Sequence, residues 1–182
     1  MPRRKSIHSV ASFPPQVASG CRVLVLGTVP SVRSLELRQS YGHPQNLFWT
    51  FMGELFDAGP TLRYPERIAR LHALGIGIWD VLHHCERPGS LDSAIVRSSE
   101  VPNDIVGLLA AMPSIRAIAF NGAKAYQSFR RHIAPRLDAA RMPQLLALPS
   151  TSPANASISR TQKLAAWSVL RAGLGDIPNW AE

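Results

Sequence analysis

The side chains best suited to chemistry in this sequence are amides, hydroxyls and a carboxylate, and they stand beside aromatic residues. They occur in four places, late in or after short apolar runs: residues 27–31 with 41–49, residues 79–80 with 89–92, residues 121–122, and residues 149–155. The amide of Asn46 can orient a water through its carbonyl oxygen, and Asp80 can carry a negative charge. The ring of Tyr41 can stack on a planar molecule. An active site needs polar and aromatic groups of this kind.

Two other kinds of site are disfavoured by the sequence. His83, His84 and Cys85 form a compact group, but there is no second cluster with metal-ligand spacing, and adjacent residues rarely all reach one ion. Residues 27–31 have neither the glycines nor the Lys of a phosphate-binding loop. We therefore expect a protein that uses neither metal nor cofactor.

The four apolar runs are residues 22–26, 76–82, 115–120 and 145–148, and the second of them contains residues 79–80. Each has the length of a buried strand and is almost continuously apolar, which is typical of a parallel sheet covered on both faces. Ligands of such sheets bind in the crevice beyond the carboxyl ends of the strands. The four groups are therefore expected to converge at one edge of the sheet.

Helical patterns alternate with these strands. Apolar residues recur at helical spacing after Pro44, after Pro65 up to Gly75, after Asn103 as the expected N-cap, and over residues 126–137 with a disturbance at Pro135. A last helix, residues 159–174, opens with a capping box of Ser159 and Gln162. This alternation predicts an α/β fold, a three-layer α/β/α sandwich with a central four-stranded parallel sheet and right-handed crossovers. We expect a single domain over residues 1–182.

Charge and composition add limits of their own. The chain has 20 basic and 12 acidic residues, a formal net charge of +8, which suits a polyanionic partner but equally fits a solvated basic surface. Two cysteines cannot build a disulfide framework, and no apolar run reaches the ~20 residues of a membrane span. We expect a cytoplasmic monomer with reduced thiols, and a loose basic tail over residues 1–15.

Three stretches resemble the uracil-DNA glycosylase superfamily. Residues 27–31, Gly-Thr-Val-Pro-Ser, resemble its motif one, and residues 41–49 look like the HPxNxFW stretch of its mismatch-specific and hypoxanthine branches. Residues 148–155 stand where the family carries motif two, the loop that inserts into the minor groove. The similarity covers roughly residues 12–170 and is closest to the hypoxanthine (deoxyinosine) branch. It implies a four-stranded parallel sheet between helices.

The same resemblance implies a function. The chain is expected to be a monofunctional DNA glycosylase that hydrolyses the N-glycosidic bond of deaminated bases in base-excision repair. Hypoxanthine is the expected base, with uracil or xanthine as further substrates. The partner would be DNA that contains such a base. The alternatives are a uracil or mismatch-specific glycosylase of the same fold, and a DNA-binding protein that recognises damage without cleaving.

Two positions depart from the family pattern. Val29 stands where most branches have an Asp or Asn that handles the attacking water, and the resemblance to the hypoxanthine branch implies that Asn46 takes over. Ala154 stands where the family usually has a Leu that fills the vacated base stack. A short wedge should extrude paired bases poorly and favour lesions that are already badly paired. Both departures also favour the non-catalytic alternative.

The expected catalytic residues are Asn46 and Asp80. An Asn carbonyl can orient a water, which suffices when the sugar is already cationic, although Asn46 could merely cap the helix that follows. Asp80 is its rival, either as a base contact or as the missing carboxylate, although an Asp at the end of a strand often just caps a turn. These alternatives stay open at the level of the sequence.

The remaining site residues are expected to bind the base or the DNA. Tyr41 would stack on the flipped base, and the amide of Asn121 would match the carbonyl and N–H of hypoxanthine, unless it is only a turn residue. The other expected base contacts are Thr28, Val29, Pro30, Ser31, His43 and Phe48. The expected DNA contacts are Ser150, Thr151, Ser152, Pro153, Ala154, Asn155, Arg33 and Arg160.

Overall fold

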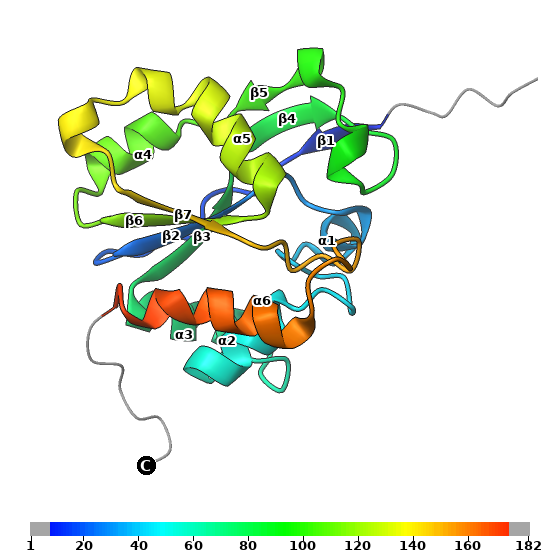
Figure 1. Ribbon diagram of the computed structural model, residues 1–182, viewed down its shortest axis with the longest axis vertical. Helices are drawn as coiled ribbons and strands as arrows, with labels where there is room; N and C mark the ends of the chain where they lie inside the picture. The colour runs from blue at the N-terminus through cyan, green and yellow to red at the C-terminus, as the bar shows by residue number, and fades with distance from the viewer. Residues whose placement is uncertain (1–7, 175–182) are drawn as a thin grey trace, which may run out of the picture.

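The computed structural model describes residues 8–174, which form a parallel sheet between two layers (Figure 1). The sheet has the strand order β3-β2-β6-β7, with β2 over Val23–Gly27, β3 over Ile76–Asp80, β6 over Ala117–Asn121 and β7 over Gln144–Leu148. Each neighbouring pair is parallel, so all four strands end at the same edge. The predicted four-stranded parallel sheet is confirmed.

Helices cover both faces of this sheet. On one face lie α2 (Phe48–Phe56), α3 (Tyr64–Leu74) and α6 (Arg160–Trp167), and on the other lie α4 (Ile105–Ala111) and α5 (Ala123–His132), as Figure 1 shows. The short α1 (Val32–Leu37) follows β2. The predicted three-layer arrangement is therefore confirmed.

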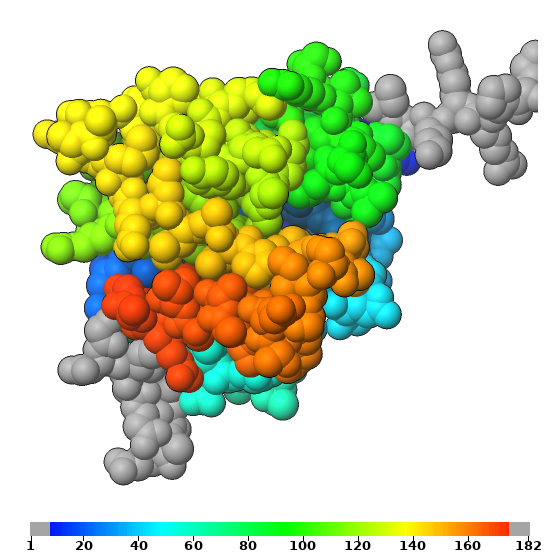
Figure 2. All heavy atoms as spheres, viewed as in Figure 1, coloured from blue at the N-terminus to red at the C-terminus, as the bar shows by residue number. Residues whose placement is uncertain are grey.

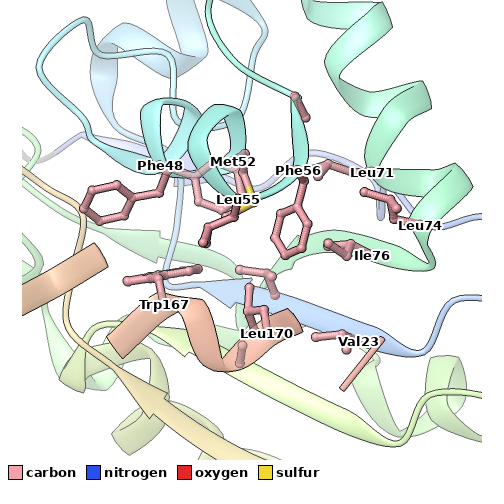
Figure 3. Close-up of a cluster of buried hydrophobic side chains, with 14 of the residues drawn as sticks. Val23, Phe48, Met52, Leu55, Phe56, Leu71, Leu74, Ile76, Trp167 and Leu170 are labelled. Atoms are coloured by element: carbon pink, nitrogen blue, oxygen red, sulfur yellow. The ribbon is translucent and has the colours of Figure 1, made fainter. Parts of the chain in front are cut away.

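The central strands are apolar throughout because both of their faces are buried. Val23 and Val25 of β2 pack toward α2, α3 and α6, whereas Leu24 and Leu26 pack against the opposite layer. The first of these cores contains Phe48, Met52, Phe56, Leu71, Ile76, Trp167 and Leu170 (Figure 3). The second contains Ile118, Phe120, Phe129 and Ile133. The two cores hold the ends of the strands, and hence the loops that follow them, in fixed places.

The predicted strand over residues 76–82 is confirmed for Ile76–Asp80 and is wrong only for its last two residues. The chain leaves the parallel sheet after Asp80, and β4 (Leu82–Glu86) joins a separate three-stranded sheet of order β1-β4-β5. In that sheet β4 pairs antiparallel with β1 (Ser9–Ala11) and with β5 (Val101–Pro102). Because Val10 is buried there opposite Cys85, the expected loose tail is wrong from Ser9 onward. Residues 1–7 of that expected tail lie outside the described residues.

Some helix ends agree with the sequence and others do not: the last helix, predicted over residues 159–174, is α-helical only to Trp167 and continues as a 3-10 turn over Ser168–Arg171. Ser159 and Gln162 form the predicted capping box, and α3 ends at Gly75, whose φ of 81° suits glycine. The N-cap of α4 is Asp104 rather than Asn103, because Asp104 Oδ1 accepts from the N–H of Gly107 at 3.0 Å.

Short 3-10 turns occur at five places in the described part of the chain. The expected disturbance at Pro135 takes this form: α5 ends at His132, and Ala134–Arg136 is a 3-10 turn. Similar turns lie at Asp92–Ala94, Arg97–Ser99, Ala139–Arg141 and Ser168–Arg171. None of the helices between residues 8 and 174 has the length and apolar character needed to cross a membrane.

Candidate active site

A cavity of about 1140 Å³ opens at the carboxyl edge of the parallel sheet. Its walls are the segments that follow the four strands, together with residues 123–127 at the start of α5. In Figure 2 the recess lies between α5, the green segment around residues 90–93 and the orange loop after β7. The expected convergence of the four polar groups is therefore what the structure shows.

Gly27 lets two functional side chains lie across the end of β2. A Cβ at this position would stand 2.7 Å from Asp80 Oδ1 and 3.0 Å from Tyr41 Oη. Any larger residue would thus push the carboxyl and the phenol apart. The glycine of the motif-one segment creates the space in which an acid and an aromatic hydroxyl share the floor of the cavity.

Asp80 is half-buried, and its carboxyl lies in this floor. Burial and, to a smaller extent, the nearby carboxylate of Asp92 raise its pKa to about 7, although the positive charge of Arg87 acts in the opposite direction. The backbone at Asp80 is held by Asn103, whose Nδ2 donates to the Asp80 carbonyl at 2.8 Å. Near neutral pH this carboxyl is therefore divided between its neutral and ionised forms.

Asp92 and Arg87 were not among the site residues predicted from the sequence. Asp92 Oδ2 accepts from the hydroxyl of Thr28 at 2.8 Å, and burial raises the pKa of Asp92. Arg87 is fully buried and donates to two backbone carbonyls, those of Pro30 at 2.6 Å and Gly89 at 2.9 Å. Asp92 stood in one of the four polar groups, but nothing in the sequence marked Arg87, because its partners are backbone atoms supplied by the fold.

Tyr41 forms one wall of the cavity. Its ring stacks on that of Phe48, with ring centroids 4.0 Å apart and an interplanar angle of 27°. Its backbone has a φ of 56°, a left-handed conformation that is uncommon for a bulky residue and is often found at functional sites. The hydroxyl is buried without a hydrogen-bond partner among the described residues, although Asn121 lies close. Burial also raises the pKa of Tyr41.

Asn46 and Asn121 are joined through Thr151. The hydroxyl of Thr151 donates to Asn46 Oδ1 at 2.8 Å and accepts from Asn121 Nδ2 at 2.8 Å. The N–H of Thr151 donates to Asn121 Oδ1 at 2.9 Å, and the N–H of Phe48 donates to Asn46 Oδ1 at 3.0 Å. The N-cap of α2 is Leu47, so Asn46 is not the cap that one interpretation of the sequence held; it bonds the first N–H of α2 from one position earlier, and it also lines the cavity.

The loop after β7 is tied down by α6 and by its own side chains. Lys163, which is 3% exposed, donates to the carbonyl of Asn155 at 2.5 Å, and Trp167 Nε1 donates to that of Pro149 at 2.9 Å. Within the loop, the hydroxyls of Ser150 and Ser152 accept from backbone N–H groups two residues on. The loop is thus an ordered rim that presents Ala154 to the cavity mouth.

Comparisons with known proteins agree with this geometry. The profile of the uracil DNA glycosylase superfamily matches residues 14–171. The chain belongs to this superfamily. It is 33% identical over 154 residues to the hypoxanthine DNA glycosylase of Methanosarcina acetivorans, covering 83% of this chain and 91% of that protein. It is 33% identical over 113 residues to the hypoxanthine DNA glycosylase of Methanosarcina barkeri, covering 62% and 70% respectively.

A solved structure is similar as well. The solution structure of a Methanosarcina acetivorans protein described as a uracil DNA glycosylase superposes with a TM-score of 0.75 at 30% identity. The similarity covers 91% of this chain and 99% of that one. The family resemblance and the fold predicted from the sequence are confirmed.

Most of the site residues predicted from the sequence line the cavity. Its lining includes both predicted catalytic residues and a majority of the predicted contacts: Asn46, Asp80, Thr28, Val29, Pro30, Ser31, Tyr41, Asn121, Ser150, Ser152, Ala154 and Asn155. Asn121 uses its oxygen and one N–H on Thr151, so it retains one N–H for a ligand.

Four residues predicted to contact the base or the DNA do not line the cavity. Phe48 is fully buried behind Tyr41, and the ring of His43 accepts from the N–H of Gln45, which shapes the turn before α2. Thr151 is fully buried, so it cannot reach a phosphate. Pro153 is exposed but does not line the cavity.

Two predicted arginine contacts also lie outside the cavity. Arg33 pairs with Glu36 at 2.9 Å, and Arg160 pairs with Glu54. Both pairs are exposed, and pairs of this kind contribute little to stability. Among residues 8–174, no three His, Cys, Asp or Glu side chains are grouped so that they could hold a metal ion.

Proposed function

We propose that this chain is a DNA glycosylase that removes hypoxanthine from DNA as the first step of base-excision repair. Superfamily membership and the two relatives named hypoxanthine DNA glycosylase support this function. The observation that carries it is the meeting of Tyr41, Asp80 and Asn46 in one cavity at the sheet edge. An aromatic wall can stack on a flipped base, and a carboxyl and an amide can form hydrogen bonds with its edge.

The base would enter this cavity and lie against Tyr41. Hypoxanthine carries a carbonyl oxygen next to an N–H, and a neutral carboxyl offers a matching O–H donor and carbonyl acceptor. The raised pKa of Asp80 keeps a large fraction of this group neutral at pH 7. We therefore assign Asp80 to the edge of the base, with the remaining N–H of Asn121 beside it.

The rest of the site would hold the DNA. Ser150, Ser152 and Asn155 lie on the rim after β7, where their polar groups can meet the backbone next to the extruded nucleotide. The net charge of +8 supports an attraction to phosphate. We further propose a monomer that works on DNA in the cytoplasm.

The test is excision from oligonucleotides that carry a single deoxyinosine, deoxyuridine or deoxyxanthosine, followed by alkali to cut abasic sites. We expect cleavage of the deoxyinosine strand and none of an undamaged strand. A strand cut only at uracil would assign the uracil alternative. Tight binding of deoxyinosine DNA without cleavage, at any enzyme excess, would show a damage-binding protein instead of an enzyme.

A further inference from the structure

The oxygen of the Asn46 amide is fully used by the protein itself. Oδ1 accepts from the backbone N–H of Phe48 at 3.0 Å and from the hydroxyl of Thr151 at 2.8 Å. An amide oxygen has two lone pairs, so both are occupied. A backbone N–H can only donate, which fixes the oxygen rather than the nitrogen toward Phe48. No residue in the described part of the chain bonds to Nδ2, which is the group of Asn46 left to face the cavity.

Thr151 is held so that its single hydroxyl proton points at Asn46. Its Oγ1 accepts from Asn121 Nδ2 at 2.8 Å, which leaves Asn46 Oδ1 as the receiver of its own proton. Its N–H donates to Asn121 Oδ1 at 2.9 Å, and its carbonyl accepts from the N–H of Leu47 at 3.0 Å. Because the residue is fully buried, water cannot replace these partners.

We propose that Asn46 acts in the reaction as a hydrogen-bond donor through Nδ2, and that Thr151 is the positioning residue that holds its amide in this orientation. This inference rests on the proposed glycosylase function. The bonds run in one direction, from Asn121 to Thr151 to Asn46, and hydrogen bonds in such a chain polarise one another. Bonds accepted by the Asn46 oxygen draw electron density from its nitrogen, which makes the Nδ2 hydrogens stronger donors.

The chemical step then divides as follows. The oxygen of a water bonds to C1′ of the deoxyribose, and the C1′–N9 bond breaks with its electron pair leaving on the purine. Asn46 Nδ2 donates to the departing purine, where negative charge grows, and so lowers the barrier. The attacking water loses a proton to solvent, and the purine takes one from solvent after release. The oxygen of Asn46 does not accept a hydrogen bond from the attacking water.

Asn46→Asp separates the donor from the acceptor role. The variant keeps an oxygen for Phe48 and Thr151, but it replaces the donating Nδ2 with a second, negatively charged oxygen. We expect its single-turnover rate on deoxyinosine DNA to fall by about two orders of magnitude or more, the scale for losing one group that binds the transition state. The single-turnover rate of Asn46→Ala should fall by a similar factor. An Asn46→Asp enzyme that matches or exceeds the wild-type rate would overturn the proposal, because a carboxylate holds a water better than an amide does.

Thr151 is tested with Val, which keeps the shape and removes the hydroxyl, and with Ser, which keeps the hydroxyl. We expect Thr151→Val to lower the single-turnover rate at least about tenfold, since a small misplacement of a reacting group is costly. Thr151→Ser should recover most of that loss. Thr61→Val, at an exposed position outside the cavity, is the matched control. Circular dichroism and thermal melts establish that each variant is folded.

A second readout does not depend on activity. The NMR signals of the Asn46 side-chain NH₂ should move in Thr151→Val and remain in place in Thr61→Val. An unchanged Asn46 signal together with a wild-type rate in Thr151→Val would overturn the positioning role. A wild type that excises no deaminated base would overturn the proposed function, whereas the NMR comparison would still decide whether Thr151 holds Asn46.

Discussion

The ring of Tyr41 lies flat on that of Phe48, 4.0 Å away, while its hydroxyl is buried beside Asp80 without a hydrogen bond from the described residues. The stacking stabilises the wall of the cavity, and the unpaired hydroxyl costs free energy in the free protein. An unpaired group of this kind is expected to gain its partner when a base enters.

Tyr41→Phe should therefore stabilise the free protein and slow the reaction. Removal of an unpaired buried hydroxyl should raise the free energy of unfolding by about 1 kcal/mol. Tyr64→Phe is the matched control, because its hydroxyl is bonded to Gln16 and Ser40 and its loss should destabilise by a similar amount. Urea denaturation measures both. A less stable Tyr41→Phe protein would mean that the hydroxyl already has a partner.

The pH dependence of excision follows from Asp80. If its neutral form binds the base, the single-turnover rate should fall as the pH rises through about 7, where the carboxyl loses its proton. Asp80→Asn keeps a donor beside an acceptor, so it should remain active and lose this alkaline decline. Asp57→Asn, at an exposed site, should leave the profile unchanged. A wild-type rate that instead declines below pH 7 would assign Asp80 to the reaction as a carboxylate.

The same carboxyl should make stability depend on pH. Its pKa is raised from 3.8 to about 7 on folding, so the unfolded chain ionises first and stability falls as the pH rises between these values. Asp80→Asn has no such loss. At 1.36 kcal/mol for each pKa unit, its advantage over the wild type should grow by about 3 kcal/mol between pH 4.5 and 8.5. Denaturation at both values measures this, and a constant difference would show that Asp80 is not desolvated.

Ala154 is expected to limit the extrusion of paired bases. Ala154→Leu supplies an apolar side chain of the size that fills a base stack, so excision from an inosine–cytosine duplex should rise by about tenfold relative to a single strand. Ala156→Leu adds the same side chain to the same loop at an exposed position that does not line the cavity. Equal effects of the two variants would show that residue 154 is not at the insertion point.

The parallel sheet could be predicted because its strands are buried on both faces, which leaves an unbroken apolar run in β2 and β6. The second sheet, β1-β4-β5, could not be predicted from the sequence. Its strands are short, and β4 carries the polar residues His83 and His84 before buried Cys85, a pattern that the preceding apolar run concealed. The exit of the chain from one sheet to the other at Val81 depends on tertiary pairing with Ser9–Ala11.

Some residues of the candidate site could be predicted from the sequence, and others could not. Asn46, Asp80 and Tyr41 could be found because polar and aromatic residues stand out after apolar strands. The role of Thr151 could not, because a hydroxyl in a loop rich in Ser and Thr suggests a surface contact, whereas the residue is buried between two amides. Sequence position also could not separate Asn103 from Asp104 as a cap, since both residue types suit the role.

The buried guanidinium of Arg87 donates hydrogen bonds to the carbonyls of Pro30 and Gly89, and so holds two walls of the cavity in place. Lys163 and Trp167 fasten the rim after β7 in the same manner. With its walls fixed in this way, the cavity has little freedom to reshape itself around a nucleotide. The distortion needed to bring a base inside must then fall on the DNA, and the rate of capture would be set by how often a damaged base leaves its stack unaided.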